Sequence, residues 1–320
     1  MEDLLTIHDL QTHFFTHEGT IRAVNGVNLR IGKGETLGVV GESGCGKSVT
    51  ALSIMRLIPD PPGKIVGGAI VFEGINLFKL SDREMRDIRG RKISMIFQEP
   101  MTSLDPVFTI GHEIMETLQL HQGMRREDAR KAAVDALRTV GMPDPEKILD
   151  NYPHELSGGM RQRAMIAMAL ACNPSLLIAD EPTTALDVTI QAQILQLIND
   201  LKEQLSMAVM LITHDLGVVA EMCDNVAVMY AGHVVEYTDV DTLFNKPLHP
   251  YTKGLNKSIP RLDLDVMRLE TIRGMVPNLL EVPSGCPFNP RCDFCFDKCL
   301  EEMPELQEVE RDHLVKCHLY

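Results

Sequence analysis

The sequence lacks any long apolar run, and this absence bears first on membrane insertion. Its longest stretch of hydrophobic residues, Ala164 to Cys172, has nine members, about half of the roughly 20 that a helix needs to cross a bilayer. The first ten residues alternate acidic and apolar side chains instead of running from basic to hydrophobic. We therefore expect no secretion signal and a cytoplasmic protein, which meets a membrane only through partner proteins.

Positive charge is also scarce. Lys and Arg number 31 against 45 Asp and Glu, which gives a net charge of −14, and a field of that sign repels nucleic acid and anionic lipid. No low-complexity run is present, and 44% hydrophobic with 24% charged residues is ordinary for a globular protein. A length of 320 residues favours about two domains. We expect folded domains and no nucleic-acid partner.

The hydrophobic pattern changes along the chain from strand-like to helical and back. The first 80 residues read as short strands with turns, and from about Arg83 to Leu170 the pattern is helical, with Gly141 ending one helix. Apolar strands then alternate with a helix over residues 188–204, which is typical of an α/β fold with a mostly parallel sheet. After Pro247 the chain becomes rich in turns, so a domain boundary is expected near residue 255.

The strongest motif is GESGCGKS, residues 41–48, which matches the phosphate-binding pattern GxxxxGK[ST] between an apolar strand and a helix-compatible stretch. Glycines let backbone N–H groups converge on phosphate oxygens, and the N-terminus of the following helix adds a favourable dipole. Lys47 would reach the β- and γ-phosphates, and Ser48 would ligate Mg²⁺. The candidate nucleotide-binding residues here are Gly41, Glu42, Ser43, Gly44, Cys45, Gly46, Lys47, Ser48 and Val49.

A second acidic element ends another apolar strand, SLLIADEP at residues 175–182. Asp180 is placed to hold Mg²⁺ through water, as a Walker B aspartate does, and Glu181 to polarise the attacking water. An acidic cap at a strand end is the alternative interpretation. The phosphate-binding motif in the same chain argues against that alternative.

Further segments resemble the ATP-binding-cassette (ABC) ATPases. LSGGMRQR at residues 156–163 resembles their signature motif, Gln98 in IFQEP resembles the Q-loop, Asp187 ends a D-loop-like TALD, and His214 in LITHD resembles the switch histidine. The resemblance covers roughly residues 4–250. It implies a P-loop cassette over residues 1–255, with a mixed sheet around a RecA-like core, a β-rich N-terminal subdomain and a helical insert over about residues 100–170.

The resemblance also implies a role for each matched residue. Glu181, His214 and Gln98 would be catalytic, with His214 contacting the γ-phosphate and Gln98 contacting Mg²⁺ and the water. Phe14, or else its neighbour Phe15, would stack on adenine. The signature would bind the nucleotide held by an opposite subunit, so that two chains sandwich two ATP molecules. The residues implied for this partner site are Ser157, Gly158, Gly159 and Asp187.

Three longer segments narrow the resemblance to the ATPase subunits of bacterial dipeptide and oligopeptide importers. They are the stretch after Gln98, the continued signature, and HPYT at residues 249–252; nickel importers share much of this pattern. The implied partners are a related second ATPase in a heterodimer, or a homodimer in isolation, two permease subunits and an extracellular peptide-binding protein. Docking on the permeases would use the helical insert and residues 99–105, which places the chain at the cytoplasmic face of the membrane.

Five of the eight cysteines fall in the last 35 residues. A reducing compartment disfavours disulfides, so a soft metal is favoured, with zinc, an iron-sulfur cluster and free thiols all open on chemistry alone. The tail resembles the C-terminal extension of peptide-importer ATPases, some of which carry a four-iron four-sulfur (4Fe-4S) cluster. The resemblance favours as ligands Cys286, Cys292, Cys299 and Cys317.

Alternatives to this assignment remain in the tail and for the whole chain. Cys295 is a spare or an alternative ligand, and His313 and His318 keep zinc open. The tail would be a small irregular module over residues 256–320. Two rival functions are a soluble cassette protein that acts without permeases and a redox sensor that gates the motor.

Overall fold

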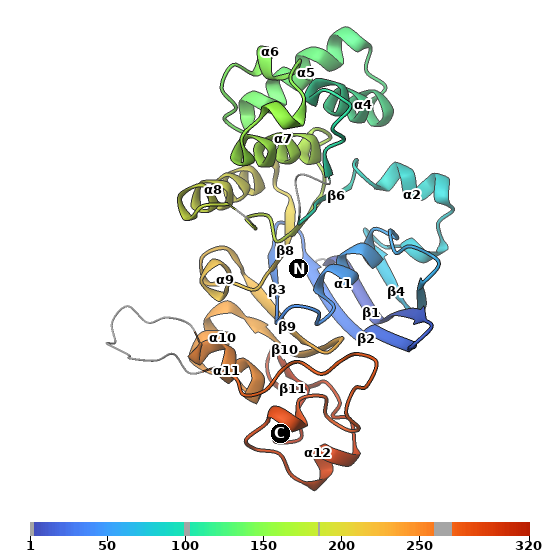
Figure 1. Ribbon diagram of the computed structural model, residues 1–320, viewed down its shortest axis with the longest axis vertical. Coiled ribbons are helices and arrows are strands. Elements are labelled where there is room, and N and C mark those ends of the chain that lie inside the picture. The colour runs from blue at the N-terminus through green and yellow to red at the C-terminus, as the bar shows by residue number, and fades with distance from the viewer. Residues whose placement is uncertain (1–2, 99–102, 185, 259–270) are drawn as a thin grey trace. The chain divides into compact units, whose positions relative to one another are not determined.

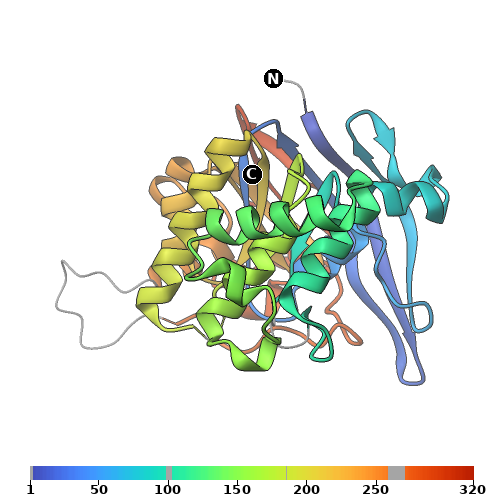
Figure 2. The same ribbon diagram turned by 90° about the horizontal axis from the view of Figure 1, so that it is seen from above.

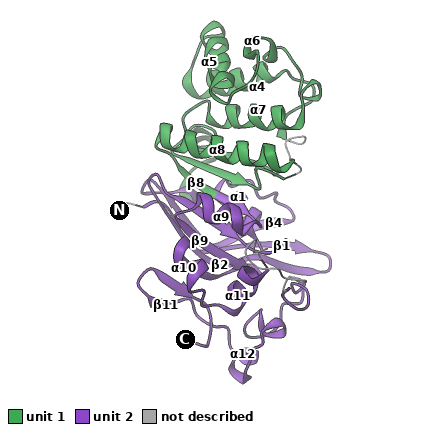
Figure 3. Cartoon of the chain, turned by 90° about the vertical axis from the view of Figure 1, so that its left-hand side faces the viewer, with its two compact units in different colours: residues 1, 79–210 green, residues 2–78, 211–320 purple. Residues whose placement is uncertain are grey.

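The computed structural model describes residues 3–98, 103–184, 186–258 and 271–320 (Figure 1). The chain folds into two compact units (Figure 3): unit 1 holds residues 79–210, and unit 2 holds residues 2–78 and 211–320. Within the described ranges, no helix combines the length and the apolar character that crossing a bilayer requires.

The N-terminal part of unit 2 is an antiparallel sheet in the strand order β2-β1-β4-β5. Strands β1 (Asp3–Thr16) and β2 (Gly19–Gly32) form a long hairpin, drawn in blue in Figures 1 and 2. Strand β4 (Gly63–Phe72) pairs with the other edge of β1, and β5 (Ile75–Asn76) pairs with β4. The prediction of strands in the first 80 residues is therefore confirmed, but β1 and β2, with 14 residues each, are longer than the short strands expected.

A second run of paired strands in unit 2 joins the two ends of the chain. Strand β3 (Thr36–Val40) lies parallel to β9 (Asn225–Tyr230), and β9 is antiparallel to β10 (His233–Asp239). Strand β12 (His313–Val315) pairs with β10 and with β11 (Gln307–Glu310). The expected separate, irregular tail module is not supported, because β12 extends the strands of unit 2. The domain boundary near residue 255 stays a prediction.

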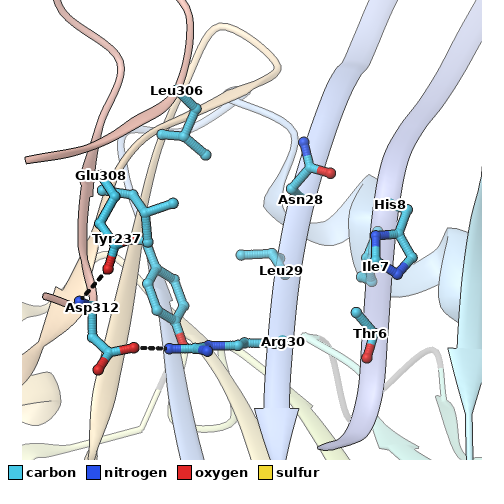
Figure 4. A pocket seen from close by; sticks show the side chains of 11 residues that line it. Thr6, Ile7, His8, Asn28, Leu29, Arg30, Tyr237, Leu306, Glu308 and Asp312 are labelled. Carbon is cyan, nitrogen blue, oxygen red and sulfur yellow. Dashed lines mark hydrogen bonds and ion pairs between the residues drawn. The ribbon is translucent and has the colours of Figure 1, made fainter.

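The hairpin of β11 and β12 is also tied to the N-terminal sheet. Arg30 of β2 donates to the carboxylate of Asp312 at 2.5 Å, and the Asp312 N–H donates to Glu308 at 2.9 Å (Figure 4). The Arg30 guanidinium lies 5.8 Å from the centre of the Tyr237 ring. Side chains from these strands line an apolar cavity of about 270 Å³, so the C-terminal end packs on the start of the chain.

Short helices complete unit 2. The first follows the glycine-rich loop after β3, and the others follow the later strands. They are α1 (Lys47–Ile54), α9 (Leu216–Met222), α10 (Val240–Asn245), α11 (Pro250–Lys257), α12 (Asp297–Glu301) and the 3₁₀ turn η3 (Asn289–Arg291).

Unit 1 contains two parallel strands, β6 (Ile93–Ile96) and β7 (Leu176–Asp180), whose residues are all buried. Strand β6 corrects the prediction of a helical pattern over about residues 83–170. Its four apolar residues pair with β7 from Ile93 opposite Leu176 onward, and a run buried on both faces carries no alternation that marks it as a strand. Strand β8 (Ala208–Thr213) then leads from unit 1 into unit 2.

The rest of unit 1 is helical, and α4, α5 and α7 pack on one another (Figure 1). The predicted helix that ends before Gly141 is confirmed as α5, with Gly141 at a φ of +69°, where glycine carries no Cβ penalty. The helical insert is confirmed as well. The 3₁₀ turn η1 (Leu77–Lys79) leads along the chain from unit 2 into unit 1. The helical elements of unit 1 are α2 (Asp82–Ile88), α4 (Ile110–Gln122), α5 (Arg126–Thr139), α6 (Pro145–Ile148), η2 (Pro153–Glu155), α7 (Gly158–Leu170) and α8 (Val188–Leu205).

Candidate nucleotide-binding site

The loop between β3 and α1 can be built only with glycine at two of its positions. A Cβ on Gly41 would lie 2.2 Å from the carbonyl oxygen of Met229, and one on Gly46 would lie 2.3 Å from that of Ala23. Both residues also have positive φ, +152° and +105°, which an L side chain disfavours. The loop backbone is therefore held close to the rest of unit 2 where it leads into α1.

Lys47 is the first residue of α1, and its side chain folds back under the loop. Its Nζ donates to the carbonyl oxygens of Gly41 at 2.7 Å and Glu42 at 3.1 Å, and only 5% of the residue is exposed. Cys45 is fully buried beside it, and burial raises the pKa of the Cys45 thiol. The Lys47 ammonium is thus held against the carbonyl oxygens of the loop, and its contact with phosphate stays a prediction.

Glu42 in the loop is held by two residues from the C-terminal part of unit 2. Its backbone N–H donates to the hydroxyl of Tyr251 at 2.9 Å. Its carboxylate accepts two hydrogen bonds from Arg291, at 2.6 and 3.0 Å. Arg291 is not among the residues predicted from the sequence, and its partner lies 249 residues away in the chain.

Two of the predicted catalytic residues meet in unit 1. The Gln98 amide donates to the Glu181 carboxylate at 3.1 Å, and the Thr184 hydroxyl donates to the same carboxylate oxygen at 2.9 Å. Asp180, one residue earlier at the end of β7, is 4% exposed, and Glu181 itself has a φ of +46°. Backbone strain of this kind clusters at functional sites. Thr184 was missed, although it stands in the predicted D-loop segment.

The signature segment begins α7 in unit 1. The Ser157 hydroxyl accepts a hydrogen bond from the Met160 N–H at 3.4 Å and so caps the helix, while Ser157 and Gly158 themselves are exposed. Asp187 caps α8 in the same way, and the next residue, Val188, is 83% exposed. Both predicted partner-site segments therefore lie on the surface of their unit.

The remaining predicted residues lie in unit 2. His214 is exposed and directly follows β8. The Phe14 ring packs on Gly63, where a Cβ would lie 2.8 Å from its Cε1, whereas Phe15 is 52% exposed. The stacking role of Phe14 stays a prediction. Each unit thus carries part of the predicted set: the loop, Phe14 and His214 belong to unit 2, and Gln98, Asp180, Glu181, Ser157, Gly158, Gly159 and Asp187 belong to unit 1.

The four cysteines predicted as ligands line one small cavity in unit 2, and Cys295 is not among the residues that line it. Burial, together with the neighbouring cysteines, raises the pKa of Cys286 to about 11. Among the described residues, no group of three or more His, Cys, Asp or Glu is arranged to hold a single metal ion. All eight cysteines are described, and none forms a disulfide.

The two histidines considered as possible zinc ligands have other partners. His313 is hydrogen-bonded to the buried carboxylate of Glu236 at 2.8 Å, and His318 lies 2.9 Å from the carbonyl oxygen of Glu302. A single zinc ion needs four donors about 2.0–2.3 Å from one point. The prediction of a zinc site therefore finds no support in the described residues.

The chain matches two known sequence families. Residues 24–184 match the family described as ABC transporter, and residues 235–299 match the family described as oligopeptide/dipeptide transporter, C-terminal region. The chain is 58% identical over 98% of its length to a probable peptide ABC transporter ATP-binding protein of Sinorhizobium fredii, covering 94% of that protein. It is 52% identical over its full length to the oligopeptide transport ATP-binding protein AppD of Bacillus subtilis, covering 98% of that protein.

Solved structures show the same fold. A dimer of the ATP-binding cassette MJ0796 in a post-hydrolysis state, bound to ADP and Pi, aligns with a TM-score of 0.66 and 30% identity over 74% of this chain and 98% of that chain. CbiO1 of Clostridium perfringens, part of an ABC transporter complex, aligns with a TM-score of 0.64 and 26% identity over 77% of this chain and 92% of that chain.

Proposed function

This chain belongs to the ABC transporter family of ATPases, and we propose that it hydrolyses ATP to drive uptake of dipeptides or oligopeptides across the cytoplasmic membrane. The observation that carries the proposal is the presence of both sequence families on one chain, together with 48–58% identity to peptide-transport ATPases over almost its whole length. The geometry of the glycine loop supports the ATP-binding part of the proposal.

Different residues of the chain have different proposed roles in hydrolysis. The loop N–H groups and Lys47 bind and orient the phosphates, because fixed donors stabilise the charge that develops in the transition state. Mg²⁺, when bound, would neutralise phosphate charge, and the residues proposed to hold it, Ser48 of unit 2 and Asp180 and Gln98 of unit 1, each carry an oxygen donor of the kind that such a hard cation prefers. Glu181, held by Gln98 and Thr184, orients the attacking water. His214 contacts the γ-phosphate.

The exposed signature supports a dimer in which each chain completes the other's nucleotide site. Ser157, Gly158 and Asp187 are exposed in their own unit, and α7 begins at Gly158, where the positive end of a helix dipole suits an anion. We expect the natural partner to be a related second ATPase in a heterodimer, with a homodimer forming in isolation.

Docking against two permease subunits is proposed for the segment before α4 and for the helical insert. Val107 and Phe108 are 69% and 43% exposed, and Leu120 on α4 is 73% exposed, so this part of unit 1 offers apolar side chains to a partner. Residues 99–102 of the predicted docking segment lie outside the described residues. The chain would act at the cytoplasmic face, with an extracellular peptide-binding protein delivering the substrate.

We propose a 4Fe-4S cluster for the four cysteines, in preference to zinc. Their shared cavity supports a common ligand, and a four-thiolate cluster fits this donor set better than one ion, because it spreads its ligands over several irons. Raised pKa values at Cys286, Cys292 and Cys317, caused mainly by burial, mean that the thiolates need a cationic partner. A brown protein with iron and a visible absorption band is expected; a colourless protein that contains zinc would contradict this.

The Glu181→Gln variant tests the function. In membranes that hold the assembled transporter, we expect it to bind ATP with normal affinity and to lose hydrolysis and peptide uptake together. The matched control is Glu127→Gln on the exposed face of α5, which should leave both unchanged. Full ATPase activity in Glu181→Gln would overturn the assigned mechanism.

The cargo and the partners are tested with the same membranes. Uptake of a labelled dipeptide or oligopeptide supports the proposal, whereas uptake of nickel alone replaces it with nickel import. Co-purification of two membrane subunits is expected in detergent. ATPase activity from a chain that brings down no membrane subunit would favour a cassette protein that works without permeases.

A further inference from the structure

The phosphate-binding loop contains a carboxylate, and that carboxylate needs a partner if the loop is to receive ATP. Glu42 directly follows Gly41 and stands five residues before Lys47. Like charges a few ångströms apart repel, and they do so most strongly where water is excluded. An unpaired Glu42 would therefore oppose the phosphates that the loop is built to bind.

Arg291 meets this need through a rigid pair. Its guanidinium makes both hydrogen bonds to the Glu42 carboxylate, and its side chain is 3% exposed while that of Glu42 is 32% exposed. Its Nε also donates to the carbonyl oxygen of Arg273 at 2.9 Å. A planar guanidinium that binds a carboxylate through two bonds fixes both its charge and its direction.

An aromatic cluster holds Arg291 in this orientation. The guanidinium lies 5.7 Å from the ring centre of Tyr230 and 5.9 Å from that of Phe288. Tyr251, which accepts the Glu42 N–H, lies 4.7 Å from Tyr230 and 5.5 Å from Phe288 between ring centres. Both tyrosines are fully buried, so the side chain and the backbone of Glu42 are held by one packed group.

The cysteine segment, residues 285–299, fixes the backbone that carries Arg291. The Arg291 N–H donates to the carbonyl oxygen of Phe288 at 3.0 Å, and the Cys286 N–H donates to that of Cys299 at 2.8 Å. Gly285 has a φ of +69°, and a Cβ there would lie 2.4 Å from the Cys299 carbonyl oxygen. The backbone of this segment is therefore closely packed, and it places the Arg291 side chain against the phosphate-binding loop.

We propose that Arg291 is a positioning residue for ATP binding, which neutralises Glu42 and holds it away from the phosphates. The C-terminal segment is thereby part of the nucleotide site's support within the same chain. This inference rests on the proposed binding of ATP. It assigns to the cysteine segment a task that is independent of which ligand its thiols hold.

The test measures Mg-ATP binding to the purified full chain by calorimetry, with Glu181→Gln present throughout so that hydrolysis does not consume the ligand. Arg291→Ala should bind ATP on the order of tenfold more weakly, because it leaves the Glu42 carboxylate unpaired beside the phosphates. Adding Glu42→Gln to Arg291→Ala should restore affinity to within about threefold. Rescue by removing the charge of Glu42 distinguishes repulsion from a loss of packing.

Two further measurements sharpen the outcome. Repulsion is screened by salt, so the deficit of Arg291→Ala should shrink from low salt to molar salt. The matched control is Arg30→Ala, which breaks another arginine–carboxylate pair of unit 2 and should leave ATP affinity unchanged. If Arg291→Ala does not fold, Arg291→Lys takes its place, because it keeps the charge and loses the two-bond geometry. Its ATP affinity should lie between that of the wild type and a tenfold loss.

Several results would overturn the inference. They are wild-type affinity in the folded Arg291 variants, a deficit that Glu42→Gln fails to restore, and a deficit that salt leaves unchanged. A parent chain that binds no ATP would instead overturn the proposed function, so the two failures are distinguishable.

Discussion

The phosphate-binding loop and the signature segment are both proposed to bind ATP, yet this chain builds them in opposite ways. The loop is packed against its own unit, with Lys47 and Cys45 buried and Glu42 held by Tyr251 and Arg291. At the signature, Ser157 is exposed and caps α7 through a single long hydrogen bond. The loop is thus held by contacts within its own unit, whereas the signature segment lies exposed, as the proposed contact with a partner chain requires.

This difference predicts where a substitution acts. A change in the loop acts within the single chain, because the atoms that it disturbs belong to unit 2. A change in the signature leaves the single chain nearly unaffected and acts only once two chains meet. Binding measured on the isolated chain, compared with turnover of the assembled transporter, separates the two.

The largest effect is expected at Gly46. Gly46→Ala places a Cβ 2.3 Å from the Ala23 carbonyl oxygen at a φ of +105°. The loop must therefore shift, and we expect a loss of about a hundredfold or more in ATP affinity, since a misplacement of about 1 Å at such a site has that scale. Calorimetry on the isolated chain measures it, and near-normal binding would mean that the loop is not held as tightly as its contacts indicate.

Gly44→Ala is the matched control in the same loop. Gly44 also has a positive φ, +78°, but nothing lies within 4 Å of the Cβ that it would carry. The variant should cost only about 1–2 kcal/mol of stability for the left-handed backbone and affect ATP affinity much less. If both variants bind ATP equally poorly, backbone conformation and not close packing limits this loop.

The next largest effect is expected at Ser157. Ser157→Ala should leave ATP affinity of the isolated chain unchanged and reduce ATP turnover of the assembled transporter by about tenfold, because it removes one hydrogen-bonding group from the partner's nucleotide. The change also removes a helix cap, worth about 1 kcal/mol. A thermal unfolding curve gives that cost separately.

Ser81→Ala controls for the lost cap. Ser81 caps α2 through the Glu84 N–H at 3.3 Å, so the variant loses the same kind of bond in the same unit. We expect a similar loss of stability with normal turnover. Equal losses of turnover in the two serine variants would argue that the signature acts through stability alone.

Features fixed by neighbouring residues were predictable from the sequence. The glycine loop, α5 with its end at Gly141, and the acidic end of β7 depend on local spacing and on apolar runs, and the structure confirms them. Strand β6 was missed because a buried run of four residues has neither strand alternation nor helical length.

The support of the loop could not have been predicted from the sequence. Arg291 and Glu42 are 249 residues apart, and no periodicity links residues at such a distance. Tyr251 stood in a motif, HPYT, that was noted only as a family marker. Its bond to the Glu42 N–H depends on how α11 packs against β9, through the ring contact of Tyr251 with Tyr230. Long-range packing of this kind places side chains that carry no local signal.

A last effect, on the free energy of unfolding, is expected from acid at His233. Burial, and then the charge of Lys316, lower the pKa of His233 to about 3 from 6.5. The folded value is below the unfolded one, so this stabilisation is present above pH 6.5 and is lost as pH falls toward 3. From pH 7.5 to 5.5 the expected loss is about 1.4 kcal/mol.

Since Gly232, the residue before His233, donates to the Cys45 carbonyl oxygen at 2.9 Å, ATP affinity should weaken over the same pH range. His233→Gln should flatten that part of the unfolding free energy against pH, whereas His17→Gln, in the exposed β1–β2 turn, should not. Equal slopes in the two variants would remove His233 from the support of the loop.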